Sequence, residues 1–273
     1  MSSFIAATGA EFTKTFTTRM WWVLAVVAFG YVALMAGGLA AIFGFTSSQS
    51  ELPEGMSPIP GGGEPSALIY SFASSIGYVF PVLLGALAVT NEFRHRTLTP
   101  TFLATPRRGL VLGGKLVALF VMGGVFGVVG VLGSVGLGAP ILAAFDLETE
   151  LGASDTWAMI GRILLAMALW GVVGVALGTM VPSQVGSIVI ILAFTQFVEP
   201  TLRAVTMLAD WAADVGKFLP GAASDALVGA SFFSVVGGGG EALEWWQGGL
   251  VLLAYAVVFA VIGYLTSWKR DIT

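Results

Sequence analysis

Long apolar segments joined by short polar connections make up most of the chain. A helix that crosses a membrane needs about 20 predominantly apolar residues. The pattern predicts six such segments, at residues 21–45, 67–90, 116–145, 157–181, 186–198 and 248–268. The fifth either stops at residue 198 or continues with a break, because Pro200 disfavours helical geometry at Glu199. The pattern therefore predicts an all-α membrane protein with six transmembrane helices.

The composition supports this class and excludes others. The 273 residues are 56% hydrophobic and only 10% charged, with a mean hydropathy of +0.91, whereas about a quarter of the residues in soluble domains are charged. A water-soluble globule of this composition would expose large apolar patches. The chain has no cysteine, which excludes disulfides, thiol nucleophiles and cysteine-bound zinc or iron–sulfur sites.

The placement of lysine and arginine predicts the orientation. The first apolar segment is longer than the roughly 7–15 residues of a signal peptide, so it is interpreted as an uncleaved span. With the N-terminus inside, nine of the twelve basic residues fall on the cytoplasmic side, as expected because cytoplasmic loops retain lysine and arginine. We therefore expect a multi-pass protein whose N- and C-termini are both cytoplasmic.

Three segments outside the predicted spans have features of their own. Residues 1–20 predict an amphipathic interfacial helix, because Phe12, Phe16 and Met20 fall on one helical face and Lys14 on the other; a disordered tail is the alternative. Residues 91–115 form the basic cytoplasmic loop within a transmembrane domain at 21–273. The outer segment 199–247 is too long for a simple turn, and we expect re-entrant or short helices there, before the glycine run 237–240.

Small residues recur at four-residue spacing within several predicted spans. The rows include Gly77, Pro81 and Gly85 in the second span, Gly123 and Gly127 in the third, and Gly174 and Gly178 in the fourth. Such rows let helix backbones approach closely in membranes. Packing within the chain is the favoured interpretation, and a dimer seam is the alternative.

No set of residues predicts an enzyme. His95, the only histidine, lies between two arginines and lacks the spacing of a metal site. The glycine runs lack the lysine of a phosphate-binding loop, so we expect no catalytic residue, no metal and no ATP hydrolysis in this chain. Glu199 is placed at the outer end of the fifth span. With no carboxylate near a span centre, ion-coupled transport is disfavoured.

Two stretches resemble a known family. Residues 91–109 read NEFRHRTLTPTFLATPRRG and are followed by Gly114-Lys115, and the N-terminus carries Glu11-Phe-Thr-Lys14 and then Arg19-Met-Trp-Trp22. These stretches resemble the permeases of ABC-2-type transporters, especially those of actinobacteria. The resemblance implies the type V exporter fold, with six spans and an N-terminal interfacial helix. The family usually has glycine where this chain has Arg96.

The resemblance implies a function and its partners. The chain would be the permease of an ABC exporter in the bacterial cytoplasmic membrane, moving a hydrophobic or amphipathic drug, antibiotic, peptide or lipid. It would pair with a second permease copy or paralogue, contact membrane lipids and bind two ATPase subunits, which hold ATP and Mg. No nucleic acid is expected as a partner.

The resemblance also implies which residues carry the coupling. The loop between spans two and three would contain the coupling helix, with Arg107 and Arg108 as the expected surface contacts. The residues assigned to coupling are Glu92, Arg94, Arg96, Thr97, Thr105, Pro106, Arg107 and Arg108. The alternative for this loop is topogenic charge that only sets the orientation.

Two other functions remain open, an ion-coupled or passive transporter and a non-transporting scaffold or sensor. For an exporter, aromatic side chains of spans two and five are candidates for the substrate path, although lipid-facing positions are an equal alternative. These residues are Phe72, Tyr78, Phe80, Phe194 and Phe197.

Overall fold

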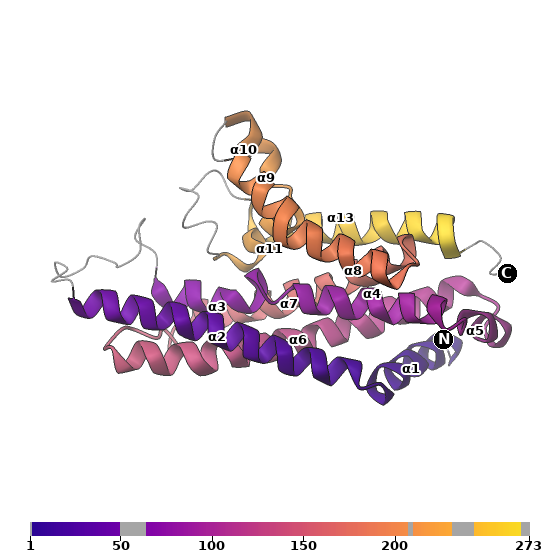
Figure 1. The fold of residues 1–273 in the computed structure, drawn as a ribbon, viewed down its shortest axis with the longest axis horizontal. Helices are drawn as coiled ribbons and strands as arrows, with labels where there is room; N and C mark the ends of the chain where they lie inside the picture. The colour runs from indigo at the N-terminus through magenta and orange to yellow at the C-terminus, as the bar shows by residue number, and fades with distance from the viewer. Residues whose placement is uncertain (1, 50–63, 207–209, 231–242, 269–273) are drawn as a thin grey trace.

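The computed structural model describes residues 2–49, 64–206, 210–230 and 243–268. Within these ranges, six helical rods are long and apolar enough to cross a membrane: Met20–Ser48, Pro65–Arg94, Arg108–Ala144, Ser154–Met180, Gln184–Thr206 and Trp245–Trp268. The rods run mostly along the long axis of an elongated molecule, except that the end of the fifth, Glu199–Thr206, turns away from the bundle (Figure 1). The protein is therefore an all-helical, multi-pass membrane protein, as the apolar pattern predicts.

Helices make up nearly all of the described residues. In chain order they are α1 (Ser2–Thr17), α2 (Met20–Gln49), α3 (Pro65–Ser75), α4 (Val79–Arg94), α5 (Leu98–Ala104), α6 (Arg108–Ala144), α7 (Ser154–Met180), α8 (Gln184–Ala193), the π-helical turn η1 (Phe194–Val198), α9 (Glu199–Thr206), α10 (Asp210–Gly216), α11 (Pro220–Val228), α13 (Trp245–Gly263) and the π-helical turn η2 (Tyr264–Trp268). Helices suit a lipid solvent because they pair their own backbone polar groups.

Glycine rows bring the central helices into backbone contact. A Cβ atom at Gly85 would lie 2.4 Å from the carbonyl oxygen of Gly171, and one at Gly174 would lie 2.2 Å from that of Val82. The same holds between α6 and α7, where a Cβ at Gly123 would lie 2.4 Å from the oxygen of Met167. These rows therefore pack α4, α6 and α7 together within the chain, the interpretation favoured from the sequence.

The second span is broken rather than continuous. The sequence pattern treats residues 67–90 as one segment, but α3 ends at Ser75 and α4 begins at Val79. Pro81 explains the break: it has no N–H to donate to the carbonyl of Gly77, and its ring would collide with that carbonyl in a regular helix. The Gly77 oxygen instead accepts a bond from the Phe80 N–H at 3.1 Å.

The fifth span continues through its proline. The sequence allows this span either to stop at residue 198 or to continue past Pro200. The structure shows the second alternative, a helical rod over Gln184–Thr206. The turn Phe194–Val198 is π-helical. This wider turn directly precedes Pro200, where a regular helix would bring the proline ring against the carbonyl of Gln196. Glu199 consequently lies inside the rod instead of at its end, and is only 2% exposed.

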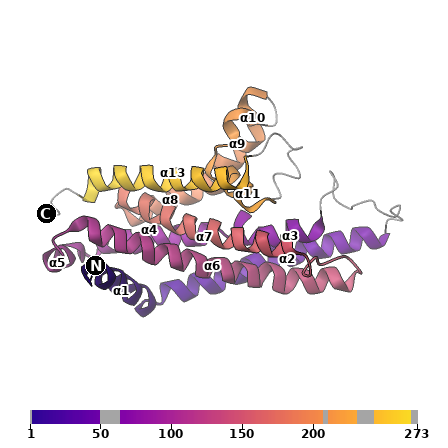
Figure 2. The same ribbon diagram turned by 180° about the vertical axis from the view of Figure 1, so that it is seen from behind.

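Short helices gather at two places along the rods. Helices α1 and α5 lie together with the beginning of α6 at one end, which we call the α5 end (Figures 1 and 2). Helix α9 leaves the bundle at an angle, with α10 at its tip, and α11 lies below it. Helices α10 and α11 fall in the segment where the sequence predicts short helices. The glycine run 237–240 lies outside the described residues.

Helix α1 turns a polar face toward the bundle. Glu11 and Thr15 are buried, at 4% and 8% exposed, whereas Ile5 and Phe16 are 66% and 50% exposed. The buried face meets α6 closely, because a Cβ at Gly114 would lie 3.0 Å from the Thr8 nitrogen. Of the apolar side chains on α1, Ile5 and Phe16 thus point away from the bundle, as a helix lying in the membrane interface needs, whereas Phe12 is half-buried against the core.

Candidate functional site

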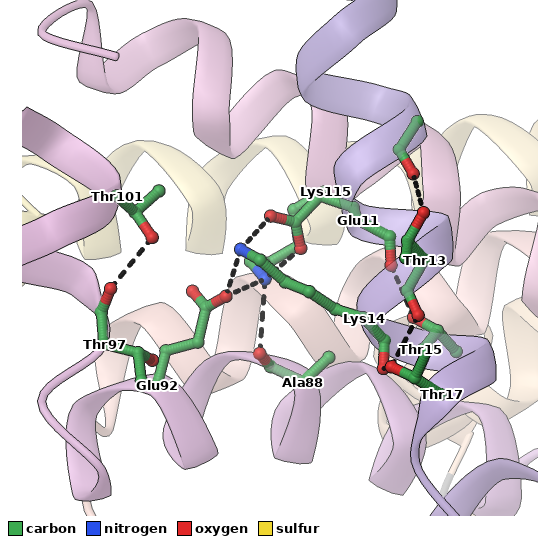
Figure 3. Close-up of polar contacts among 11 residues, drawn as sticks. Glu11, Thr13, Lys14, Thr15, Thr17, Ala88, Glu92, Thr97, Thr101 and Lys115 are labelled. Atoms are coloured by element: carbon green, nitrogen blue, oxygen red, sulfur yellow. Dashed lines mark hydrogen bonds and ion pairs between the residues drawn. The ribbon is translucent and has the colours of Figure 1, made fainter. Parts of the chain in front are cut away.

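Four charged side chains from three helices converge at the α5 end, and we call them the charge quartet. Glu11 and Lys14 come from α1, Glu92 from the last turn of α4, and Lys115 from the third turn of α6. Figure 3 shows the two ammonium groups between the two carboxylates. The quartet therefore joins the N-terminal helix to the second and third spans.

The contacts within the quartet are closely spaced. The Lys14 Nζ lies 2.7 Å from the Oε1 atoms of both Glu11 and Glu92. Lys115 donates to the Oε2 of Glu11, lies 3.2 Å from the Oε1 of Glu92 and donates to the backbone oxygen of Ala88 at 3.2 Å. An ammonium group has three N–H donors, so Lys115 has an acceptor for each of them.

Three of the four side chains in the quartet are buried, so their charges depend on one another instead of on water. The side chains of Lys115, Glu11 and Glu92 are 1%, 4% and 8% exposed, and that of Lys14 is 42% exposed. Burial alone would raise the pKa of Glu11, but Lys115 and Lys14 together hold that pKa below its ordinary value of 4.5. Burial would lower the pKa of Lys14, yet Glu11 and Glu92 raise it above 10.5. Glu11 and Lys14 are thus ionised at neutral pH, and the quartet combines two acidic with two basic side chains.

One oxygen of the quartet has no hydrogen-bond partner among the described residues. It is the buried Oε2 of Glu92, which points to the side where Thr97 and Thr101 lie (Figure 3). A cavity of about 360 Å³ adjoins the quartet between α1 and α5, with Glu11, Lys14 and Thr101 in its lining. A buried carboxylate oxygen without a hydrogen bond costs free energy. The hydrogen bonding of the quartet is therefore less complete on the side that faces α5.

The turn after Glu92 has a left-handed residue at its centre. Arg96 has a φ of 55°, a conformation that glycine adopts without penalty and other residues avoid. The Arg96 N–H bonds to the Phe93 oxygen at 3.2 Å and the Thr97 N–H to the Glu92 oxygen at 3.0 Å. These two bonds form the Schellman motif that ends a helix. The tight turn therefore forms with arginine at the position where the resembled family has glycine.

Helix α5 is anchored through one face. Leu98 is fully buried, and the Phe102 ring lies 5.5 Å from that of Trp268 in η2. Arg108 and Trp268 exchange two hydrogen bonds of 3.1 Å, each from a side-chain N–H to the other residue's backbone oxygen. The Arg108 guanidinium also lies 4.9 Å from the centre of the Phe102 ring. The last span thereby holds both α5 and the start of α6.

The other face of α5 is exposed. Leu103 is 79% exposed, and Arg96 and Arg107 are exposed on the flanking turns. Arg107 and Arg108, which the sequence treats as equivalent surface contacts, therefore differ: Arg107 faces outward, whereas Arg108 holds Trp268.

The remaining loop residues from the sequence prediction are spread around this helix. Arg94 donates to the Gln184 side chain at 2.6 Å and so reaches the start of α8. Thr97 and Thr105 flank α5, and neither side chain caps it. Pro106 is exposed. The eight predicted coupling residues therefore fall into three groups. Glu92 belongs to the buried quartet, some of the others contact other helices, and the rest lie on the exposed turns that flank α5.

Sequence reasoning did not assign Glu11, Lys14 or Lys115 to the site. Lys115 was counted as a loop charge because the third span was placed from residue 116, whereas α6 begins at Arg108. The available signal was a charged residue followed by a long apolar run, together with Glu11 and Lys14 three residues apart on a predicted helix. Charges in such positions are rare unless they are paired.

The five candidate substrate-path aromatics lie in separate environments. Tyr78 is buried against Trp170, with ring centres 4.5 Å apart, and Phe80 meets Tyr31 at 6.1 Å. Phe72 and Phe194 are half-buried. Phe197 is 72% exposed. The structure thus gives no common lining to these five side chains, and Tyr78 alone of them borders the polar cavity beside Glu199.

A second buried ionic group lies near α11. Arg203 contacts the Glu199 Oε1 at 3.0 Å and the Asp225 Oδ2 at 2.6 Å. The Glu199 Oε2 is buried without a hydrogen-bond partner in the described part of the chain. Residues 2–49, 64–206, 210–230 and 243–268 contain no group of three histidine or acidic side chains placed to hold a metal ion.

Comparison with protein-family models and with curated proteins finds no match to this chain. The described residues define the class as a multi-pass membrane protein with six helices that are long and apolar enough to cross a membrane. The quartet and the half-exposed α5 are the features that a functional proposal has to explain.

Proposed function

We propose that this chain is the permease subunit of an ATP-driven exporter of the ABC-2 type, moving a hydrophobic or amphipathic compound out across the bacterial cytoplasmic membrane. Two such permeases pair, and two separate subunits bind ATP and Mg and dock on the α5 end, which faces the cytoplasm. The proposal is supported by the resemblance of residues 91–109 and by the lysine and arginine distribution. The contacts of α5 add a physical argument.

The observation that carries the proposal is that α5 is held firmly on one face and exposed on the other. A helix that transmits the movement of a partner has to be fixed to the spans it moves. Leu98 and Phe102 fix α5 from within the chain, and the quartet ties α1, α4 and α6 together behind it. A loop with a purely topogenic role needs none of these contacts, because buried charges are costly unless they are fully paired.

The exposed face has the chemistry of a docking surface for a protein. Leu103 offers an apolar anchor, and Arg96 and Arg107 surround it with positive charge. Interfaces gain most of their affinity from a few buried anchors, and charged rims contribute specificity and association rate. The partner is therefore expected to present an apolar pocket with acidic residues at its edge.

Co-purification tests this proposal. The tagged chain, solubilised gently from its host, should bring down a protein with a Walker-type ATP site, and the Leu103→Glu variant should lose it. Asp214→Lys is the matched control, because Asp214 is 78% exposed and lies away from α5. Retention of the same ATPase by a correctly inserted Leu103→Glu variant, or no ATPase with the wild-type chain, would refute the assignment.

A second candidate, ion-coupled transport, is favoured by one observation. The apolar pattern alone disfavours it, because that pattern places Glu199 at the end of a span. Glu199 instead lies within the rod Gln184–Thr206 and has a buried, unpartnered oxygen, and intramembrane carboxylates are default candidates for ion pathways. Transport by the reconstituted chain alone, driven by a proton or sodium gradient without ATP, would support this function.

A further inference from the structure

A small polar cavity lies where the irregular parts of two spans meet α11. It has a volume of about 110 Å³ and receives residues from α2, from the α3–α4 break, from η1 and α9, and from α11. One water molecule needs only about 10–15 Å³ on such a measure. The cavity therefore has room for a polar head group of several heavy atoms, with contributions from four separate parts of the chain.

Glycine brings α11 directly against the charged side chains of this cavity. A Cβ at Gly221 would lie 2.2 Å from the Glu199 Oε1 and 2.4 Å from the Arg203 Nη2. Ser75 on the second span donates to the Asp225 Oδ1 at 3.3 Å. The ionic group is thus clamped between α3, α9 and α11, and its geometry is built by the fold.

Among the described residues, the charges that line the cavity do not balance. Glu199 and Asp225 contribute two carboxylates, and Arg203 contributes one guanidinium. Arg203 and Ser75 engage Asp225, and Arg203 also engages the Oε1 of Glu199. The Glu199 Oε2 is buried without a hydrogen-bond partner among the described residues, and a buried polar oxygen without a partner costs free energy. The cavity therefore provides an acceptor for a cationic hydrogen-bond donor.

The lining favours an organic ammonium over a divalent metal ion. Calcium and magnesium require about six or more oxygen ligands in a closed shell, and the described residues offer no trio of acidic or histidine ligands. The rings of Tyr31 and Tyr78 border the cavity, and aromatic faces attract ammonium groups. Phe197 and Val198 are 72% and 44% exposed, so the span that carries Glu199 also presents apolar surface.

We propose that the cavity beside Glu199 binds the protonated amino group of the exported compound, whose class is therefore a cationic amphiphile. This inference rests on the proposed export function and specifies its cargo. The ammonium group donates a hydrogen bond to the Glu199 Oε2 and restores charge balance. The apolar body extends over the exposed residues of the fifth span.

Binding to the purified full chain in lipid nanodiscs, without an ATPase, tests the site separately from the export function. The probe is a dansyl-labelled primary alkylamine, and its N-acetylated, uncharged form is the control. We expect Glu199→Gln to weaken amine binding at least tenfold and to leave binding of the acetylated probe unchanged. Asp214→Asn, which neutralises an exposed carboxylate, should bind both probes as the wild type does.

A second variant keeps the proposal testable if Glu199→Gln fails to fold. Tyr31→Leu removes an aromatic ring from the lining and changes no charge, and should weaken amine binding about threefold to fivefold. Equal amine affinity in the folded Glu199→Gln variant and the wild type would overturn the proposal, as would equal binding of the two probes. Failure of the chain to capture an ATPase would refute the export function and leave this binding result intact.

Discussion

The ammonium group of Lys115 donates a buried hydrogen bond to the carboxylate of Glu11, although the two residues are 104 positions apart in the chain. The bond fastens an N-terminal helix that lies outside the spans to the third span. With Lys14 and Glu92 it forms a group without net charge, so each member compensates another. This mutual dependence leads to the first prediction.

Replacing one member of the quartet should lower the stability of the folded chain more than replacing an oppositely charged pair. Lys115→Met leaves two buried carboxylates with only the half-exposed Lys14, and loss of one partner from a buried ion pair typically costs about 3–5 kcal/mol. Lys115→Met combined with Glu11→Gln leaves Lys14 paired with Glu92. We expect the double variant to melt in detergent at a higher temperature than Lys115→Met alone.

Lys14→Met serves as the comparison within the same group, because 42% of the Lys14 side chain is exposed and water offsets part of the loss. It should be milder than Lys115→Met. Strictly additive losses in the double variant would show that Glu11 and Lys115 do not stabilise each other in the folded chain.

The attachment of α1 should depend on pH at both extremes. Because the pKa of Glu11 is lowered in the folded chain, its contribution is present above pH 4.5 and is lost as the pH falls through the folded pKa. Because the pKa of Lys14 is raised, its contribution is present below pH 10.5 and is lost as the pH rises through the folded pKa. Stability should therefore level off between about pH 5 and 10.

Limited proteolysis near α1 across this pH range measures the effect. The Glu11→Gln variant is the control, since it lacks the acidic group and should lose less protection on acidification than the wild type. Identical acid limbs in the two proteins would mean that Glu11 does not hold α1 in place.

Arg96→Gly should stabilise the chain. At the φ of 55° a residue with a Cβ is strained by about 1–2 kcal/mol, and glycine relieves this strain at some cost in unfolded-state entropy. We expect a net gain of up to about 1 kcal/mol, measured as a higher melting temperature. Arg96→Ala removes the same charge without relieving the backbone, so it should melt below Arg96→Gly. The reverse order would argue against a left-handed residue in this turn.

The two adjacent arginines should behave differently when reversed in charge. Arg108→Glu breaks the contacts with Trp268 and Phe102 and should cost about 1–3 kcal/mol of stability. Arg107→Glu changes an exposed side chain and should alter stability by no more than about 0.5 kcal/mol, while weakening capture of the ATPase. Melting curves and co-purification on both variants give the comparison, and equal destabilisation by the two substitutions would contradict the assigned contacts.

The spans were predictable because their signal is local. Each rod is an apolar stretch that can be read directly from the sequence, and only its interruptions depended on geometry. The break before α4 arises because Pro81 has no N–H to donate to the carbonyl of Gly77. A hydropathy pattern contains no information about such a missing hydrogen bond. The effect of Pro200 on the preceding helix is compatible with either an end or a continuation of the fifth span. The span continues because the π-helical turn before Pro200 accommodates the proline ring.

The site was less accessible from the sequence because its members converge only in the folded chain. Glu92 is 78 residues from Lys14 and was included only through the family resemblance. Lys115 was interpreted as a loop charge because hydropathy does not locate the first turns of α6. The burial of Glu199 depended on the continuation of the fifth span and on α11 closing over it through Gly221.

Site-specific crosslinking from α5 identifies the molecule that contacts the exposed face of this helix in the cell. A photoreactive amino acid at position 103, in cells that express the native transport genes, should form a covalent adduct with a neighbouring protein. The same group at position 214 serves as the control. We predict that mass spectrometry identifies a Walker-type ATPase in the adduct from position 103 and not from position 214. Adducts from position 103 that contain only lipid, or a protein without an ATP site, would contradict the assignment of α5 as the coupling element.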